Sequence, residues 1–246
     1  MSYSPGQAAR RLLAARKGAT VVRWRDVAPP DQGAAYAVQD ETLRSIGPVG
    51  GWKVGAASPQ SQPACAPLPA AGLQPDGAAL LGPPWHMRGI EVELALRLGR
   101  DLGAAPSRQE LVEAVDAVLP AIEIVETRLA DWRESEPLAQ LADLQSHGAL
   151  VLGAPSVIDP RDIDLRRIEA YLAFDGQPVA STYGAHATGD VWGLLQWLAA
   201  HCAARGQPLR AGQVVTTGSC TGLLFAHDGA HVQAHLKGIG LVQLRF

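Results

Sequence analysis

The sequence predicts an α+β protein that is rich in β-structure and has a small helical region at its N-terminus. Three observations support this class. Apolar residues recur at helical spacing in two segments before residue 48, whereas apolar runs of strand length dominate the chain after residue 88. From residue 213 onward the chain contains strand-like segments alone. No self-similarity occurs at a period of about 20–50 residues, which argues against solenoids and propellers.

The N-terminal region is expected to hold two helices and one strand. The first helix spans 5–17, starting from a Ser-Pro cap and ending at a glycine. The second helix begins near Asp31 and ends at the Gly-Pro pair before residue 49. The glycine-bounded segment GGWKVGAAS follows as a short strand, and this strand carries Lys53.

Residues 58–77 are rich in proline, and they predict a long irregular connection. We expect a domain boundary at its end. Residues 1–75 then form the helical region with the strand of Lys53, and residues 76–246 form a β-rich domain.

Two further helices are expected within the β-rich domain. Ser107 and Glu110 form a capping box that opens a helix with Val115 and Val118 on its apolar side. Asp190 caps a second helix, which runs to a glycine at residue 206.

Strands fill the rest of this domain. The pairs Asp175-Gly176 and Asp228-Gly229 predict hairpin turns. The expected strands lie within 91–98, 121–125, 147–153, 169–180, 213–219, 222–236 and 240–246.

Composition restricts the function classes. With 47% hydrophobic and 18% charged residues and a net charge of −3, the chain has the profile of a soluble globular protein. A pI near 6.2 and the lack of a basic stripe argue against nucleic acid as a partner. No apolar run approaches the ~18 residues of a membrane span, and no secretory signal is recognisable. Three widely spaced cysteines favour reduced thiols, so we expect a cytoplasmic protein.

The segment GIEVELALRLGRDL (89–102) places two acids on one face of a strand. Glu91 and Glu93 point the same way, about 6.6 Å apart along the chain, while the alternate residues are apolar. Two like charges at that separation repel by about 2–2.5 kcal/mol at an effective dielectric near 20. Solvent, a basic partner or a divalent cation could offset this repulsion.

A third acid favours the cation. Glu123 lies in the apolar run AIEIV, where a buried carboxylate is expected to be paired or coordinated. Three carboxylates form a hard-oxygen set that suits Mg²⁺ or Mn²⁺ rather than zinc. His227, His231 and His235 form a rival set, but an Asp-Gly turn interrupts them. The last two would be about 13 Å apart on a strand, too far to share one ion.

Lys53 is a second unusual residue, because it lies in a short strand between Trp52 and Val54. A lysine there can reach the surface from a strand edge. Near carboxylates and a cation it can instead transfer protons or hold a substrate carboxylate.

The motifs GWKVG, GIEVELALRLGRDL, AIEIVETR, TTGSCTG and GIGLVQLRF occur in the order and approximate spacing of a known family. The chain resembles the 2-keto-4-pentenoate hydratase and 4-oxalocrotonate decarboxylase group of the fumarylacetoacetate hydrolase superfamily. The resemblance extends over nearly the whole chain, including AAYAVQDETL in the second helix.

The resemblance implies a rolled sheet sandwich preceded by the helical region. It also implies that Glu91, Glu93 and Glu123 bind Mg²⁺ or Mn²⁺, which makes 76–246 the metal-binding catalytic domain, and that Lys53 is the family lysine. The family's Thr-Gly-Ser-x-Thr-Gly turn maps onto Thr217–Gly222. The substrate-binding candidates of this turn are Gly218, Ser219 and Thr221, since its glycines let backbone amides approach a substrate.

One segment departs from the family pattern. After Ala142-Asp143 the hydratases continue with asparagine and a small residue, whereas this chain has Leu144 and Gln145, then His147 before a glycine. The segment is expected near the pocket, so the departure bears on the substrate and on hydration itself.

The resemblance, taken together with these residues, leads us to expect a metal-dependent lyase that hydrates a small 2-hydroxy-dienoate or 2-oxo-enoate in aromatic catabolism. The cation would chelate the C1 carboxylate and the C2 oxygen. Lys53 would move protons or orient the substrate, and Asp143 would position water. The alternatives are a 4-oxalocrotonate-type decarboxylase, an acylpyruvate C–C hydrolase and a non-catalytic relative of the same fold. The apolar helix over 191–203 could face a second subunit, so a homo-oligomer is expected.

Overall fold

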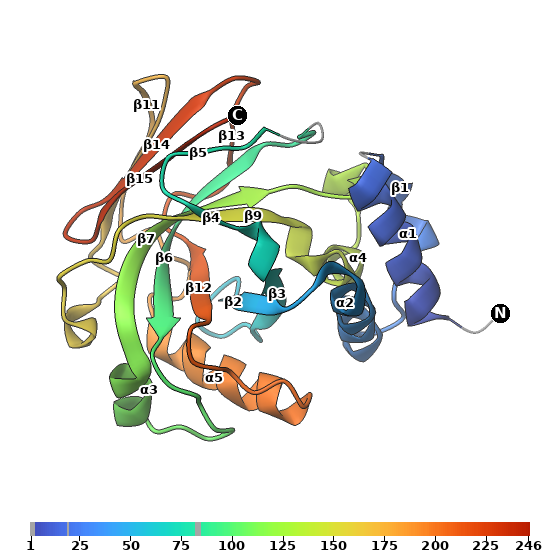
Figure 1. Cartoon of the computed structure of the whole chain (residues 1–246), viewed down its shortest axis with the longest axis horizontal. Helices are drawn as coiled ribbons and strands as arrows, with labels where there is room; N and C mark the ends of the chain where they lie inside the picture. The colour runs from blue at the N-terminus through green and yellow to red at the C-terminus, as the bar shows by residue number, and fades with distance from the viewer. Residues whose placement is uncertain (1–2, 19, 82–84) are drawn as a thin grey trace.

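Two β-sheets form the body of the protein in the computed structural model, which describes residues 3–18, 20–81 and 85–246 (Figure 1). The larger sheet has eight strands in the order β3-β2-β12-β6-β7-β9-β4, with β13 paired to β6. Its strands are β2 (Val49–Gly55), β3 (Ala64–Pro69), β4 (Leu73–Pro75), β6 (Gly89–Leu98), β7 (Val115–Val125), β9 (His147–Leu152), β12 (Val214–Ser219) and β13 (Leu224–Phe225).

The smaller sheet packs against one face of the larger one. Its order is β11-β10-β14-β15-β5, and a separate two-stranded sheet joins β1 to β8. These strands are β1 (Val22–Arg23), β5 (Ala78–Ala79), β8 (Leu129–Ala130), β10 (Glu169–Phe174), β11 (Gln177–Tyr183), β14 (His231–Leu236) and β15 (Gly240–Arg245). Val92, Leu94 and Leu96 of β6 share one buried cluster with Val232 and Val242 of the smaller sheet. The alternate residues of β6, among them both glutamates, therefore face away from this core.

Within the described part of the chain, five α-helices lie at the margins of the sheets. They are α1 (Pro5–Gly18), α2 (Gln32–Ile46), α3 (Arg108–Ala114), α4 (Pro137–Ala142) and α5 (Val191–Ala204). The α1 helix packs on α2, and α2 packs on α4, so the N-terminal helices gather at one side of the molecule (Figure 1). Asp190 caps α5 and the capping box of Ser107 and Glu110 opens α3, both as predicted. The α2 helix begins next to Asp31, where it was expected, and Asp31 caps it.

Three sequence-based expectations about the elements were wrong. Residues 58–77 contain β3 and β4 instead of an irregular connection, because β3 is a sheet edge, where prolines are tolerated. The α3 helix ends at Ala114, since Val115 and Val118 pair with β6 as part of β7. The Asp228-Gly229 turn makes no hairpin: it links β13, which pairs with β6, to β14, which pairs with β10 and β15.

The sheet pairing bears on the expected domain and subunit organisation. Strands β2 and β3 of the N-terminal 75 residues belong to the same sheet as β6 and β7, and a division at residues 75 and 76 stays a prediction. The apolar residues of α5 pack inside this chain, so the helix no longer supports a subunit contact and a homo-oligomer stays a prediction. Within the described residues, no helix is both long and apolar enough to cross a membrane.

Candidate active site

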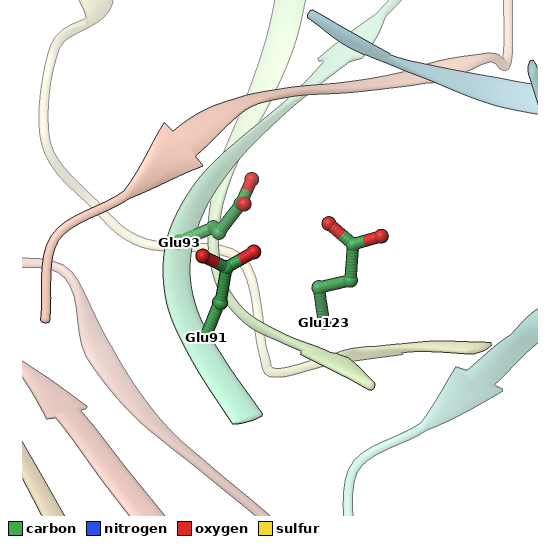
Figure 2. Close-up of side chains that lie close together, drawn as sticks. All are labelled: Glu91, Glu93 and Glu123. Atoms are coloured by element: carbon green, nitrogen blue, oxygen red, sulfur yellow. The ribbon is translucent and has the colours of Figure 1, made fainter. Parts of the chain in front are cut away.

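Three glutamates meet on the face of the large sheet that points away from the smaller sheet (Figure 2). Glu91 and Glu93 project from β6, and the antiparallel register places Glu123 of β7 directly opposite Glu91. One carboxylate oxygen of each lies within 4.8 Å of those of the other two. Among the described residues this is the group of acids, histidines and cysteines that could hold a metal ion. The structure thus brings together the three predicted ligands.

The environment raises the pKa of two of these carboxyl groups. Burial, followed by the charges of Glu123 and Glu91, raises the pKa of Glu93 to about 8. Burial also raises the pKa of Glu91 to about 7, although the ammonium of Lys53 opposes the shift. Such shifts indicate that the negative charges are poorly compensated by the protein alone.

Lys53 provides part of the compensation. It lies on β2, and its Nζ is 2.6 Å from Oε1 of Glu123, whose side chain is fully buried. Burial favours the neutral amine, but the carboxylates of Glu123, Glu91 and Glu93 outweigh it and raise the pKa of Lys53. The site therefore holds a fixed positive charge beside the three acids.

His147 is a partner that the sequence reasoning did not assign. Its Nδ1 lies 3.0 Å from Oε1 of Glu123, and both side chains are fully buried. Burial lowers the pKa of His147, so the ring is neutral, and Nδ1 must carry the proton because a carboxylate only accepts. The sequence signal was the departure at this position, where a histidine directly precedes the glycine of a buried strand. Lys53 and His147 both donate to Oε1 of Glu123. Oε2 of Glu123 is buried and has no hydrogen-bond partner in the described structure.

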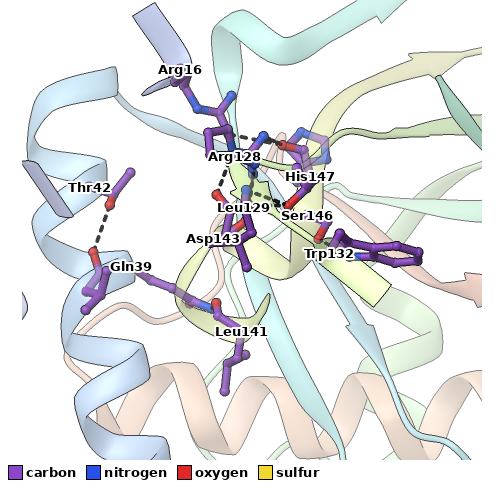
Figure 3. Close-up of polar contacts among 12 residues, drawn as sticks. Arg16, Gln39, Thr42, Arg128, Leu129, Trp132, Leu141, Asp143, Ser146 and His147 are labelled. Atoms are coloured by element: carbon purple, nitrogen blue, oxygen red, sulfur yellow. Dashed lines mark hydrogen bonds and ion pairs between the residues drawn. The ribbon is translucent and has the colours of Figure 1, made fainter. Parts of the chain in front are cut away.

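Asp143 is not among the described residues that line the pocket below, and its carboxylate contacts Arg128 and Thr127 instead of the three glutamates (Figure 3). Its side chain is 2% exposed. Its carboxylate accepts hydrogen bonds from Nε and the backbone N–H of Arg128 and from the hydroxyl of Thr127. Arg128 and Arg16 also donate to the backbone carbonyl of His147. The geometry therefore gives Asp143 a part in anchoring the segment of His147, and its expected role in positioning water stays a prediction.

The Thr-Gly-Ser-x-Thr-Gly turn forms hydrogen bonds with β6, the strand that carries Glu91 and Glu93. The N–H of Gly218 donates to Oε2 of Glu93 at 3.2 Å, with φ of +110° in the region that favours glycine. Oγ1 of Thr221 accepts from the backbone N–H of Val92, and Oγ of Ser219 accepts from the backbone N–H of Thr221. These contacts hold the turn beside Glu93. A direct contact of Gly218, Ser219 and Thr221 with substrate stays a prediction.

A pocket of about 400 Å³ opens beside the acids. Among the described residues that line it, Lys53 and Glu91 are the charged ones. The polar wall residues are Gln32, Gln140, Gln145 and Ser146, and the apolar ones include Val125, Trp132, Leu138, Leu141 and Leu223. The pocket thus has one charged end and an otherwise uncharged wall, which suits a small anion with an apolar tail.

The residues present fit a hard divalent cation. Three carboxylates converge from two adjacent strands, and carboxylate oxygen is the ligand type that Mg²⁺ and Mn²⁺ prefer. The unpartnered Oε2 of Glu123 costs free energy unless something binds it. The raised pKa values of Glu91 and Glu93 also point to a missing positive charge.

Magnesium binding is expected to raise the thermal stability of the protein. At a concentration of 100 times Kd, a ligand that binds only the folded state adds about 2.7 kcal/mol, which corresponds to about 5–10 °C in Tm for a chain of this size. Differential scanning fluorimetry with MgCl₂ or MnCl₂, followed by addition of a chelator, measures the shift. An unchanged Tm at millimolar concentrations of both ions would contradict the metal assignment.

Comparison with known proteins places this geometry in context. A family model described as fumarylacetoacetate (FAA) hydrolase C-terminal matches residues 53–246. A 2-keto-4-pentenoate hydratase of Burkholderia vietnamiensis (strain G4 / LMG 22486) is 34% identical over 257 residues, covering 97% of this chain and 95% of the relative. A 2-keto-4-pentenoate hydratase of Paraburkholderia xenovorans (strain LB400) is 36% identical over 162 residues, which span 65% of this chain and only 60% of the relative.

A solved structure matches the fold over the full length. The 4-oxalocrotonate decarboxylase from Pseudomonas putida G7, complexed with magnesium and adipate, superposes with a TM-score of 0.88 and covers 100% of this chain and 99% of that chain. Its sequence identity is 22%. This likeness confirms the predicted architecture of a sheet sandwich with an N-terminal helical region.

Proposed function

Because the chain belongs to the fumarylacetoacetate hydrolase family, we propose that it is a divalent-metal-dependent hydratase of small 2-hydroxy-2,4-dienoic acids. Relatives that match over almost its whole length include 2-keto-4-pentenoate hydratases. The observation that carries the proposal is the convergence of three carboxylates and one charged lysine at the end of a pocket that is otherwise uncharged.

Glu91, Glu93 and Glu123 would hold Mg²⁺ or Mn²⁺. When bound, the ion would supply positive charge that attracts the C1 carboxylate of the substrate and stabilises negative charge on the C2 oxygen. The protein's own residues position these carboxylates: Lys53 and His147 donate to Oε1 of Glu123, and the Gly218 N–H donates to Oε2 of Glu93.

Hydration of 2-hydroxypenta-2,4-dienoate requires two changes. The hydroxyl proton is lost and a proton is gained at C5, which gives 2-oxopent-3-enoate. Water then adds, with its oxygen bonding to C4 and a proton arriving at C3, to give 4-hydroxy-2-oxopentanoate. We assign Lys53 to orient the substrate in both steps. Its raised pKa keeps it charged at neutral pH, and of its three N–H donors one is used by Glu123 and one by the carbonyl of Gln145.

The uncharged wall supports a hydratase over a 4-oxalocrotonate decarboxylase. The tail of 2-hydroxypenta-2,4-dienoate is a hydrocarbon, which Trp132, Leu138 and Leu223 can cover. The substrate 4-oxalocrotonate carries a second carboxylate at its far end. Among the described lining residues no cation faces such a group there, so binding would leave a charge desolvated and unpaired.

Two assays test the proposal. With Mg²⁺, purified protein is expected to convert 2-hydroxypenta-2,4-dienoate with kcat/KM about 100-fold or more above that for 4-oxalocrotonate. Loss of dienoate absorbance measures the first reaction, and release of CO₂ measures the second. Faster CO₂ release would favour the decarboxylase.

Isothermal titration with oxalate, a mimic of the chelating end, is expected to show binding only when Mg²⁺ is present. Absence of that binding would leave a non-catalytic relative.

A further inference from the structure

One peptide unit of strand β12 lies outside the sheet ladder beside the acids. The register pairs of β12 with β2 end at Thr216, and its pairs with β6 skip from Thr216 to Ser219, which lies opposite Glu93. The peptide unit that joins Thr217 to Gly218 lies in this gap. Buried backbone groups that leave a ladder need other partners, because an unpaired N–H or C=O costs free energy.

Both ends of this peptide unit are hydrogen-bonded. The carbonyl oxygen of Thr217 lies 2.8 Å from Nε2 of His186, and the N–H of Gly218 donates to Oε2 of Glu93 at 3.2 Å. The peptide is trans, so it is planar and its C=O and N–H point in opposite directions. Fixing the oxygen therefore aims the N–H, and His186 is connected to Glu93 through one rigid group.

The ring of His186 can donate to this carbonyl because its other nitrogen is an acceptor. The backbone N–H of Gly189 donates to Nδ1 at 2.9 Å, so Nδ1 carries no proton. Nε2 must then carry the proton, which matches its carbonyl partner. Burial lowers the pKa of His186, in keeping with a neutral ring. The loop between β11 and α5 thus fixes the tautomer that the Thr217 carbonyl requires.

The connection is buried and closely packed. His186, Thr217 and Glu93 are 7%, 1% and 1% exposed. Hydrogen bonds are stronger away from water, and a donor to the carbonyl polarises the peptide and strengthens its N–H as a donor. A Cβ atom at Gly218 would lie 3.4 Å from Nε2 of His186, so the ring lies directly against the turn.

We propose that His186 is a positioning residue for the metal-binding carboxylate of Glu93. The imidazole holds the carbonyl of Thr217, and the N–H of the same peptide holds Oε2 of Glu93. This inference rests on the proposed function, since it requires that the three acids bind a divalent ion. His186 acts through the peptide and exchanges no proton. Partners that orient a metal ligand in this way commonly change metal affinity by about 10–100-fold when they are removed.

Two variants separate the donor of the ring from its acceptor. His186→Gln places an amide nitrogen near the position of Nε2 and can still donate to Thr217, whereas His186→Asn keeps an acceptor for Gly189 near the position of Nδ1 and loses the donor. Isothermal titration with MgCl₂ is expected to show affinity at least about 10-fold weaker in His186→Asn. In His186→Gln the affinity is expected to stay within about threefold of the wild type, because the donor is kept. His235→Asn makes the same change on the smaller sheet and is expected to leave the affinity unchanged.

A measurement on the metal-free protein tests the hydrogen bonds directly. Labelling with ¹³C-carbonyl threonine and ¹⁵N-glycine selects the amides of Gly189, Gly218 and Gly222, the glycines that follow a threonine in the chain. In proton–nitrogen NMR spectra, His186→Asn is expected to move the Gly218 amide proton upfield, because its hydrogen bond to Glu93 weakens. His186→Gln is expected to move the Gly189 amide proton instead, because the acceptor Nδ1 is lost. The Gly222 signal serves as the internal reference.

Each outcome has a distinct meaning. If His186→Asn binds Mg²⁺ as tightly as the wild type, or leaves the Gly218 signal in place, the positioning role is wrong while the proposed function stands. If His186→Gln loses as much affinity as His186→Asn, the ring acts by packing and the donor role is overturned. If the wild type binds no Mg²⁺, the proposed function fails, and this inference with it.

Discussion

Replacing Glu93 by glutamine is expected to weaken Mg²⁺ binding by at least about 100-fold and to lower kcat/KM for the dienoate by about 10³-fold. Glu93 is 1% exposed and lies between the other two acids and the Gly218 amide. Glutamine has almost the same shape and retains an oxygen that can accept from Gly218. It cannot supply the negative charge that a hard dication requires.

Isothermal titration with MgCl₂ measures the binding, and circular dichroism in the presence of a chelator checks the fold. The metal-free variant is expected to unfold within a few degrees of the metal-free wild type, because the change removes a buried ionisable group and keeps an acceptor for the Gly218 N–H. Glu113→Gln makes the same chemical change on an exposed helix residue and serves as the control. Wild-type affinity in Glu93→Gln would remove the basis for the metal site.

Physical reasoning from the sequence selected all three acids, but it determined the relative position of only two of them. Alternation alone places Glu91 and Glu93 on one face of a strand, because strand geometry is local. The position of Glu123 depends on which strands pair and in which register. A helix separates β6 from β7 in the chain, and the pairing contains an irregularity near Leu98. Nothing in the residues around Glu123 specifies that it lies opposite Glu91.

The residues that sequence reasoning missed depend on tertiary contacts. Leu144, Gln145 and Ser146 all have positive φ. Leu-Gln-Ser carries no glycine or asparagine to indicate positive φ, so the run at 144–146 could not be predicted. His147 and Glu123 are 24 positions apart, and their hydrogen bond forms because β7 and β9 are neighbours in the sheet. The resemblance did locate this segment near the pocket.

Asp143 shows the opposite case, an acid that looks catalytic in the sequence and is anchored in the structure. Its partner Arg128 is 15 positions away, and both are almost fully buried. From the sequence, Arg128 was simply the last residue of a family motif. An isolated acid near a pocket therefore says little about its role until its hydrogen-bond partners are known.

Replacing Arg128 by methionine is expected to lower the free energy of unfolding by about 3–5 kcal/mol, because the carboxylate of Asp143 is left buried and unpaired. The change also removes the donors to the carbonyls of His147 and Asp143. Urea unfolding followed by circular dichroism measures the loss as a lower midpoint. Arg161→Met removes an exposed arginine that pairs with Asp159 and is expected to change the free energy of unfolding by less than about 1 kcal/mol.

The double variant Arg128→Met, Asp143→Leu separates the two roles considered for Asp143. Removing both charges takes away the unpaired carboxylate, so the double variant is expected to be more stable than Arg128→Met alone. In the double-mutant cycle, the loss of unfolding free energy in the double variant is expected to be smaller than the sum of the two single losses.

The single variant Asp143→Asn gives a second test. If Asp143 positioned water, this variant would lower kcat while leaving the urea midpoint unchanged. The hydrogen bonds of Asp143 to Arg128 and Thr127 predict instead that the urea midpoint of Asp143→Asn falls. Arg128, which orients this carboxylate, also donates to the carbonyl of His147. Loss of the ion pair is therefore expected to displace His147 and, through its hydrogen bond, Glu123.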